Sequence, residues 1–403
     1  MKHDISRGMV WLLATACGLI VASLYYAQTL VGPISAATGL SLQAAGLIVT
    51  LTQAGYALGL LFIVPLGDLV ENRRLVFIAL LAAAAALALA AASHSGALFL
   101  AASLGIGLGS VAAQVLVPFA AHLAHEATRG ATVGKVVSGL LLGIMLARPA
   151  ASLIADHGSW RLVFGIAAVL VAGLAFLLRA TLPQRVPNAA LPYGRLIGSL
   201  WQLLRDTPVL RRRAAYHAGL FGAFSLFWTV APLMLADAPF HLSQSGIALF
   251  AIVGMAGAIA SPIAGRLADA GHTLPATAAA LLLGVASFAL PLLAPVSRTA
   301  SLALLVLASI ALDMAVAANL VLGQRAIFNL GAEVRSRLNG IYFALFFSGG
   351  AFGSAVGGWM LATHGWRAAL LTGMALPTLA LLYWIGEAVG GEAATSSAQQ
   401  PEA

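Results

Sequence analysis

The stretches "DHGSWRLVF" (156–164) and "THGWRAALL" (363–371) repeat a His-Gly-Trp-Arg pattern, with one inserted Ser in the first copy. His157 and His364 lie 207 residues apart in a chain of 403 residues, which is about half of its length. A repeat at half the chain length indicates an internal duplication.

A second pair of stretches supports this duplication. The sequences "PLGDLVENRRL" (65–75) and "PIAGRLADAGH" (262–272) align Asp68 with Asp269, 201 residues further on. Because two separate landmarks give nearly the same period in the same order, we predict that the chain consists of two related halves.

The composition indicates a membrane protein. Hydrophobic residues make up 61% of the chain and charged residues only 8%, and the mean hydropathy is +0.97. A soluble domain carries about a quarter charged residues. Such a small number of charges cannot cover a surface that faces water, so most of the exterior is expected to face lipid.

The apolar segments have the length of membrane-spanning helices, which need about 20 residues each. Because they are not short alternating strands of about ten residues, they argue against an outer-membrane barrel. We therefore predict an all-α membrane protein with twelve transmembrane helices in two pseudo-symmetric six-helix bundles. The expected spans are 9–31, 43–66, 75–93, 97–121, 133–155, 161–179, 213–236, 246–265, 275–296, 300–322, 339–362 and 366–388.

The two halves of the duplication define the domain organisation. We expect an N-terminal six-helix bundle over 1–180, a cytoplasmic linker over 181–212 and a C-terminal six-helix bundle over 213–388. A disordered cytoplasmic tail is expected over 389–403. Parallel repeats in membrane proteins are related by an axis along the membrane normal.

The distribution of Lys and Arg predicts the orientation in the membrane. Of the 21 basic residues, 17 fall on the side of the N-terminus and only Arg161, Arg298 and Arg367 on the other, while Arg148 falls inside a span. The positive-inside rule therefore places both termini in the cytoplasm. Since these charges are spread over separate segments, we attribute them to insertion and lipid headgroups rather than to nucleic-acid binding. The strong preference for Arg over Lys is typical of a GC-rich bacterial genome, which makes the bacterial inner membrane the expected location.

The loop after the second span carries a family resemblance. Asp68, Arg73 and Arg74 resemble the signature Gly-x-x-x-Asp-x-x-Gly-[Arg/Lys]-[Arg/Lys] of the major facilitator superfamily, with Val64 and Glu71 at the two Gly positions. The runs "QAGYALGLLFIVPLGD" (53–68) and "AAQVLVPFAAHLA" (112–124) are similar to its bacterial drug and arabinose-efflux-type permeases. The resemblance covers nearly the whole chain and implies a secondary transporter.

The resemblance also implies a role for this loop. In the family such a loop holds the two halves together in one state, so Asp68, Arg73, Arg74 and the second-half counterpart Asp269 are candidate gating residues. A carboxylate at the membrane boundary can accept hydrogen bonds from helix N-termini or Arg side chains, and these break when the halves move. The alternative interpretation is a loop that only sets topology.

Two positions depart from the proton-antiporter pattern of the family. Ser103 stands where many antiporters have an Arg in the fourth span, and Arg148-Pro149 replaces a Gly-Pro pair in the fifth span. The departures indicate that the usual proton-coupling Arg is absent or lies one helix further along.

Asp313 and Arg148 are the ionisable residues expected near mid-membrane, about 18 Å and about 22 Å into their helices. An isolated charge there costs at least about 2.5–3.5 kcal/mol, so each is a functional candidate. Asp313 is a candidate proton-coupling or substrate carboxylate, with a structural role as the alternative. Arg148 is a candidate anion site or counter-charge, with helix pinning as the alternative. We hypothesise that the two interact across the halves.

A set of polar and aromatic residues shares helical faces within the spans. The resemblance implies that spans one, four, seven and ten line a central cavity, and hydrogen bonding between helices is the alternative. The candidate cavity residues are Tyr25, Gln28, Gln53, Tyr56, Ser103, Ser110, Gln114, Trp228, Asn319, Gln324 and Tyr342.

Glycines at four-residue spacing predict close helix packing. Gly349, Gly353 and Gly357 form one such run in the eleventh span, and Gly139 and Gly143 form another in the fifth.

The function favoured by these features is proton-coupled efflux of a small organic compound, whether drug-like, sugar-like or nucleoside-like. A proton-coupled or facilitative importer is the main alternative. No nucleotide-binding loop or intramembrane catalytic set appears, so an ATP-driven pump or a membrane enzyme is disfavoured. We expect a monomer whose partners are the solute, protons and membrane lipid, with no cofactor. We also expect no metal, because His122 and His125 lack a further ligand beyond Glu126.

Overall fold

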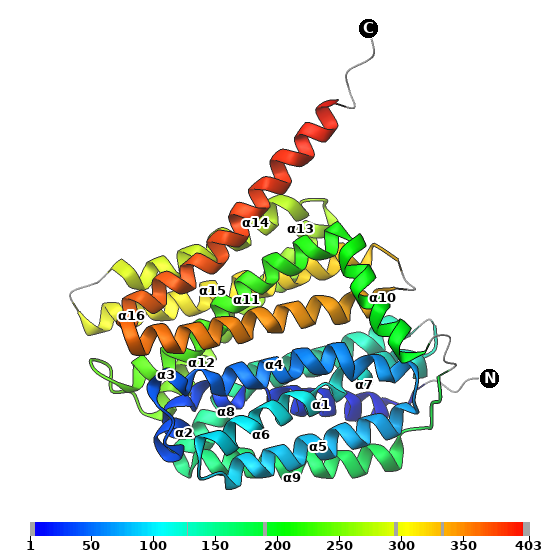
Figure 1. Cartoon of the computed structure of the whole chain (residues 1–403), viewed down its shortest axis with the longest axis horizontal. Coiled ribbons are helices and arrows are strands. Elements are labelled where there is room, and N and C mark those ends of the chain that lie inside the picture. Colours follow the sequence, from blue (N-terminus) through cyan, green and yellow to red (C-terminus); the bar gives the residue numbers. More distant parts are fainter. Residues whose placement is uncertain (1–4, 127, 188–191, 294–296, 332–333, 398–403) are drawn as a thin grey trace.

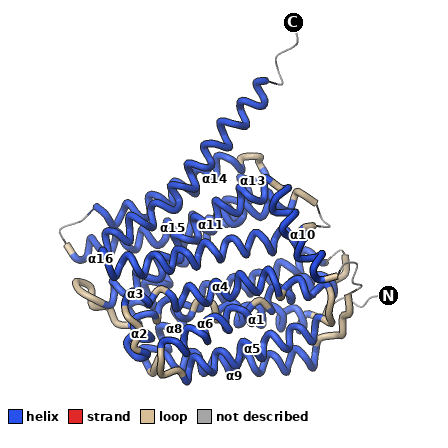
Figure 2. The backbone as a smooth tube through the Cα atoms, in the orientation of Figure 1, coloured by secondary structure: helices blue, strands red, loops and turns tan. Residues whose placement is uncertain are grey.

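Helices account for all of the regular secondary structure in the described part of the chain (Figures 1 and 2). The computed structural model describes residues 5–126, 128–187, 192–293, 297–331 and 334–397. The prediction of an all-helical membrane protein is confirmed. Ten of its helical segments are long and apolar enough to cross a membrane.

The first half forms the lower part of Figure 1. Spans one, two and four are each divided into consecutive elements, with one-turn 3-10 segments in spans one and two and a turn at Val111 in span four. The elements are α1 (Arg7–Ala22), η1 (Tyr26–Thr29), α2 (Val31–Thr38), α3 (Leu42–Ala45), α4 (Leu47–Phe62), η2 (Val64–Asp68), α5 (Asn72–Ala92), α6 (Gly96–Ser110), α7 (Ala112–Leu123), α8 (Arg129–His157) and α9 (Trp160–Thr181).

The second half forms the upper part of Figure 1 and is joined to the first by the helix α10 (Tyr193–Asp206). Its elements are α11 (Pro208–Ala236), α12 (Gln244–Gly254), η3 (Met255–Ile259), α13 (Ala260–Asp269), α14 (Thr273–Ala289), η4 (Leu290–Leu293), α15 (Arg298–Phe328) and α16 (Arg335–Ser397).

Two features reconcile ten long segments with twelve predicted spans. The first span is broken after α1, which leaves a shorter apolar helix. The last segment, α16, contains two spans that meet at Gly365, whose φ of 79° is not helical. A positive φ is readily adopted by Gly alone, so this residue separates spans eleven and twelve.

The linker and the C-terminal segment both contain helix. The linker expected over 181–212 contains α10 and the first turn of α11. Residues 389–397 are described as the last turns of α16, in place of the disordered tail expected from residue 389, and 398–403 lie outside the described residues.

Serine N-caps provide a further sign of the duplication. Ser41 and Ser243 cap the helices that open spans two and eight, and Ser95 and Ser297 cap those that open spans four and ten. Both pairs are 202 residues apart. A Ser hydroxyl accepts a hydrogen bond from a free backbone N–H in the first turn, so the two halves begin equivalent helices in the same way.

The helix ends divide the molecule into two sides. The helix α10 lies at one end of the molecule, on the right of Figure 1. The other helix ends on this side carry Arg73, Arg129, Arg179, Arg211 and Arg325, so we call this side the basic end. The opposite end carries the two repeated His-Gly-Trp turns.

The predicted glycine packing is confirmed. A Cβ atom placed on Gly353 would lie 1.9 Å from the carbonyl oxygen of Gly222, and one on Gly139 would lie 2.4 Å from that of Ala14. These contacts join α16 to α11 and α8 to α1, so small residues let the backbones approach closely within each bundle.

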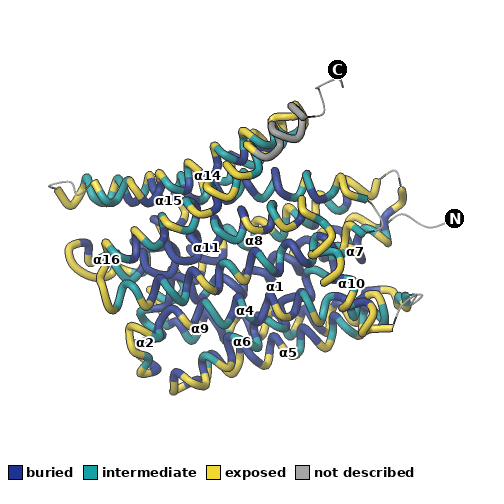
Figure 3. Tube along the Cα trace, turned by 45° about the horizontal axis from the view of Figure 1, so that its top comes forward, coloured by how far each residue is buried: buried dark blue, intermediate teal, exposed yellow. Residues whose placement is uncertain are grey.

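The two halves contact each other mainly where α16 packs against α3 and α4, where α12 packs against α8, and where α11 packs against η1 and α2. Buried residues concentrate along the middle of the molecule, and exposed apolar residues lie on the outer faces (Figure 3). The polar residues buried between the halves are therefore the candidates for a functional site.

Candidate functional site

Arg148 of α8 and Asp313 of α15 meet at the boundary between the halves. The Arg148 Nη2 atom lies 3.5 Å from Asp313 Oδ2, and the two side chains are 3% and 11% exposed. The structure thus brings together the two residues that we hypothesised to interact across the halves. An ion pair this deep in an apolar protein compensates charges that could not stay there alone.

Aromatic rings enclose this ion pair. The indole nitrogen of Trp228 donates a hydrogen bond of 3.1 Å to Asp313 Oδ1. The guanidinium of Arg148 lies over the Trp228 ring at 3.9 Å from its centroid and 5.1 Å from that of Phe224. Trp228 therefore contacts both charges, through its N–H edge and through its electron-rich face. Its predicted stacking surface is occupied by Arg148 in this conformation.

Several buried polar atoms of Arg148 and of other residues in the spans have no hydrogen-bond partner among the described residues. They are Nε and Nη1 of Arg148, both amide atoms of Gln28, the hydroxyl of Ser152 and Nδ2 of Asn319. Gln28 lies in η1, which packs against α8, and Ser152 is one helical turn from Arg148. Since buried polar groups normally have partners, the atoms of Arg148, Gln28 and Ser152 give this region an unused capacity to bind a polar molecule.

Polar contacts join the halves from the middle of the molecule to the opposite end. Gln53 Nε2 of α4 donates to Ser225 Oγ of α11 at 2.8 Å, and the hydroxyl of Ser225 lies 3.2 Å from Gln53 Oε1. Ser354 of α16 donates to the carbonyl of Gly46 at 3.0 Å. Ser245 and Asp156 are hydrogen-bonded between α12 and α8. Each of these bonds joins one half to the other.

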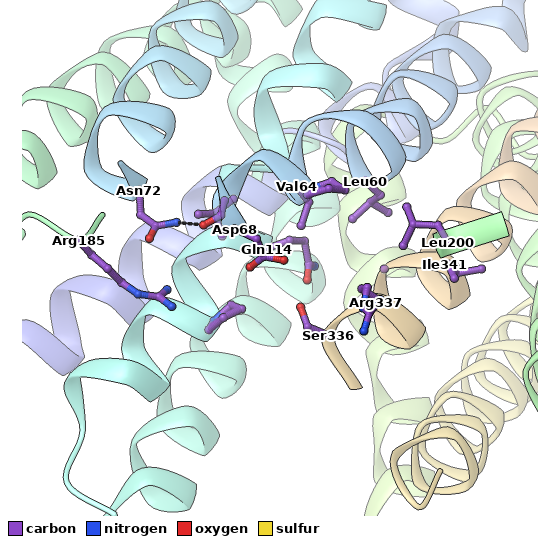
Figure 4. Close-up of a pocket in the computed structure, with 15 residues that line it drawn as sticks. Leu60, Val64, Asp68, Asn72, Gln114, Arg185, Leu200, Ser336, Arg337 and Ile341 are labelled. Atoms are coloured by element: carbon purple, nitrogen blue, oxygen red, sulfur yellow. Dashed lines mark hydrogen bonds between the residues drawn. The ribbon is translucent and has the colours of Figure 1, made fainter. Parts of the chain in front are cut away.

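A crevice separates the halves at the basic end (Figure 4). It encloses about 50 Å³, which is room for a few water molecules, whereas pockets for organic ligands usually exceed about 300 Å³. Gln114 lines it and donates to the hydroxyl of Tyr56 at 3.0 Å. The halves must therefore separate further before a solute can enter.

The loop with the family signature borders this crevice. Asp68 is exposed in η2 and faces Ser336 and Arg337, in the first turn of α16, across the crevice (Figure 4). Among the described residues it forms no ion pair with Arg73 or Arg74.

Glu71 interacts with the basic residues of this loop instead. Its carboxylate accepts hydrogen bonds from the backbone N–H groups of Arg73 and Arg74 and so caps α5. The side chain of Arg73 reaches the carbonyl of Leu182 at 3.3 Å. In the sequence Glu71 stands out only as a departure at a Gly position, although its place directly before the helix is that of an N-cap residue.

The second-half counterpart forms an ion pair. Asp269 Oδ1 lies 2.6 Å from Arg325 Nη2, and both side chains are more than half exposed. Arg325, which follows the predicted cavity residue Gln324, was not among the predicted site residues.

The other predicted cavity residues lie in contacts between or within helices. Ser103 and Ser110 donate to carbonyls of their own helix, at 2.9 Å and 2.7 Å. Gln324 donates to Asn339 at 3.2 Å, and Tyr342 is hydrogen-bonded to His217. Tyr25 is buried beside η1. The structure thus brings Arg148, Asp313 and Trp228 together, with Tyr25 and Gln28 at the adjacent η1. Asn319 is buried six residues beyond Asp313 on α15.

Comparison with known proteins gives the context of this geometry. A family model described as the Major Facilitator Superfamily matches residues 11–329. An uncharacterized transporter of Escherichia coli, YgaY, is 40% identical over 383 residues, which cover 95% of this chain and 96% of that protein.

Solved structures share the fold. The nucleoside transporter NupG superposes with a TM-score of 0.74 at 14% identity, covering 94% of this chain and 99% of that one. A D-xylose-proton symporter superposes with a TM-score of 0.71 at 18% identity, covering 94% and 97%. At such identities the likeness extends to the fold alone.

Proposed function

The chain belongs to the Major Facilitator Superfamily, and from this premise we propose that it exports a small organic compound across the bacterial inner membrane in exchange for protons. It is a multi-pass membrane transporter of a small solute rather than an enzyme. The direction, the proton coupling and the class of solute are the parts that we propose.

The observation that carries the proposal is the ion pair of Arg148 and Asp313 between the halves. Each half supplies one charge, so the pair stabilises the arrangement in which the halves are close at mid-membrane. Protonation of Asp313 would remove its charge and weaken this contact. The free energy of bringing the halves together would then depend on whether a proton is bound, which is what coupling requires.

The contacts at the two ends support alternating access. At the opposite end hydrogen bonds such as Ser245–Asp156 join the halves, while at the basic end Asp68 and Arg337 face each other across a crevice. A tilt of one half against the other would break the first set and close the second. We propose that Asp68 then contacts the first turn of α16, where free backbone N–H groups attract a carboxylate.

The distribution of basic residues supports an orientation in which the basic end faces the cytoplasm. Both termini would then be cytoplasmic. We propose that the transporter works as a monomer, because each chain contains both halves and the complete ion pair.

The unpartnered polar atoms favour a solute with several hydrogen-bonding groups. Released from Asp313, the guanidinium of Arg148 could donate to oxygen atoms of the solute, and Gln28 and Ser152 could both donate and accept. Trp228 would offer a flat face to a ring. Sugar-like, nucleoside-like or polar drug-like compounds meet this description.

Import is the second candidate, and a specific observation favours it. The fold is shared with a D-xylose-proton symporter, so the scaffold accommodates proton-driven uptake equally well. The residues proposed here for coupling would serve either direction.

A two-part experiment tests the proposal. A deletion strain carrying wild type or Asp313→Asn is first screened against a panel of polar drugs, sugars and nucleosides. Export predicts hypersensitivity that the wild type reverses and the variant does not, whereas import predicts resistance or loss of growth on a solute. Transport of the identified compound into proteoliposomes, with and without an imposed pH gradient, then tests coupling. Transport that is indifferent to the gradient would contradict it.

A further inference from the structure

A groove at the basic end, on the flank of the second half, has the features of a binding site. It encloses about 570 Å³, which is within the range of ligand pockets. Its walls come from α10, α11 and α16, and none of the candidate transport residues contributes to it. The lining residues are Trp201, Leu204, Arg205, Arg211, Ala214, Ala215, Ala218 and Leu345.

The helix α10 supplies one wall. Its residues Leu196 and Leu200 are buried against the bundle, while Trp201, Leu204 and Arg205 turn toward the groove. Trp201 is 69% exposed. A helix with one buried apolar face, an exposed Trp and flanking Arg residues is typical of a segment that lies in the membrane interface. Figure 1 shows α10 inclined to the spanning helices at their basic end.

The other wall, formed mainly by α11, changes from basic to apolar along the helix. Arg211 lies at the outer end, and Ala214, Ala215 and Ala218 follow it toward the middle of the membrane, with Leu345 of α16 beside them. The distance from Arg211 to Ala218 is about 10 Å along the helix axis. The small Ala side chains leave the groove open, so it is basic at the interface and apolar below.

The neighbouring Arg residues differ in the groups that their side chains contact. Arg212 pairs with Glu387 at 3.3 Å, and Arg213 donates to Thr277 at 2.7 Å. Arg211 donates to the carbonyls of Leu204, at 3.3 Å, and of Arg205. These carbonyls neutralise no charge. The two guanidinium groups that line the groove, of Arg205 and Arg211, form no ion pair with the described residues.

We propose that this groove binds an anionic phospholipid of the leaflet at the basic end. The phosphate lies between Arg205 and Arg211, Trp201 packs against the glycerol backbone, and an acyl chain runs along Ala215, Ala218 and Leu345. Charge complementarity at the top and apolar surface below match one phospholipid, whereas free phosphate would use only the top. The inference is independent of the solute and of the direction of transport.

Bound lipid would hold α10 against α11 and so restrain the connection between the halves. Because α10 also lies beside the crevice, where Leu200 lines the wall, a lipid in this groove is placed to influence how far the halves separate.

Retention of lipid by the purified full-length protein tests the proposal. Protein in detergent is mixed with phosphatidylglycerol or phosphatidylcholine, and bound lipid is measured by native mass spectrometry. We expect wild type to retain phosphatidylglycerol preferentially and Arg205→Gln/Arg211→Gln to retain about tenfold less, because basic residues near an anionic lipid each contribute several-fold to affinity. Arg129→Gln/Lys135→Gln is the matched control. It removes two exposed charges from the same end of the molecule, outside the groove, and should match wild type.

A second variant is needed because Arg211 also donates to carbonyls of α10, so its substitution could change the position of that helix. Ala215→Phe keeps both Arg side chains and fills the groove, so it should lower retention of phosphatidylglycerol as the double variant does. An excess of inorganic phosphate should leave retention in wild type unchanged. Equal retention by wild type and both groove variants, equal loss in the control, or displacement by phosphate would each overturn the proposal.

Discussion

The carboxylate of Asp313 and the guanidinium of Arg148 lie 3.5 Å apart, on opposite halves of the molecule, at the depth where the sequence places mid-membrane. Trp228 donates to the first and lies under the second. A contact shared by three residues from α8, α11 and α15 ties the halves together at one point. Its energy depends on two charges, so any event that neutralises one of them affects the relative position of the halves.

The first prediction concerns the stability of this pair. Removing one partner leaves the other as an uncompensated buried charge, which costs about 3–5 kcal/mol, whereas replacing both with neutral residues of similar size is much less costly. We expect Arg148→Gln and Asp313→Asn each to lower the thermal unfolding temperature of the purified protein. The double variant should recover most of the loss. Additive losses in the double variant would show that the residues do not interact.

The second prediction concerns the contact between the halves near the middle of the molecule, at Gln53 and Ser225. Ser225→Ala removes the partner of the buried Gln53 amide and costs about 1–3 kcal/mol in the conformation described. We expect cysteines introduced between this contact and the opposite end to react faster, when Ser225 is replaced, with a membrane-impermeant thiol reagent added on that side of the membrane. Ser110→Ala, a buried serine whose hydroxyl bonds only its own helix, is the matched control.

The third prediction concerns packing inside the second half. A Cβ atom at position 353 would meet the backbone of Gly222 at 1.9 Å, so Gly353→Ala forces α11 and α16 apart. Overpacking of this kind costs about 1–3 kcal/mol. The yield of monodisperse protein on size-exclusion chromatography should fall sharply.

Gly165→Ala is the control for this variant, because no atom lies within 4 Å of the added methyl group. It should be neutral or stabilising by up to about 1 kcal/mol, since Ala favours the helix over Gly. Equal behaviour of the two variants would contradict the close contact between α11 and α16.

The fourth prediction concerns the exposed pair of Asp269 and Arg325. An exposed ion pair contributes only about 0–1 kcal/mol to stability, so Arg325→Ala should leave the unfolding temperature nearly unchanged. If the pair has a gating role, Arg325→Ala should nevertheless lower the rate of transport, measured with the solute once it has been identified. A large loss of stability would instead assign it a structural role.

Much of the fold could be predicted from the sequence, because lipid imposes strong constraints on length and composition. The number of spans and the duplication follow from apolar runs and repeated motifs. The breaks within spans did not follow from these signals. Those at η1, η2 and η3 are one-turn changes in hydrogen bonding that leave the apolar pattern intact.

The site was predicted in part. Charges inside a span are costly, so Arg148 and Asp313 stood out against an apolar background. Ser103 and Ser110 did not separate in the same way, because a hydroxyl that bonds its own helix has the same sequence pattern as one that faces a cavity. Ser225 and Ser152 could have been found by their helical spacing from Trp228 and Arg148, respectively.

Two distances measured across the halves test whether the ion pair of Arg148 and Asp313 governs their relative tilt. In a protein with Cys17→Ala, spin labels at positions 129 and 335 report on the basic end, and labels at 162 and 363 report on the opposite end, all at exposed sites. Double electron–electron resonance then measures both distance distributions in the wild type and in Asp313→Asn, which mimics the protonated carboxyl. We expect the variant to shift the two distance distributions in opposite senses, one toward longer and one toward shorter distances. Distributions that stay unchanged, or that lengthen together at both ends, would contradict the claim that this ion pair governs a tilt of the two bundles.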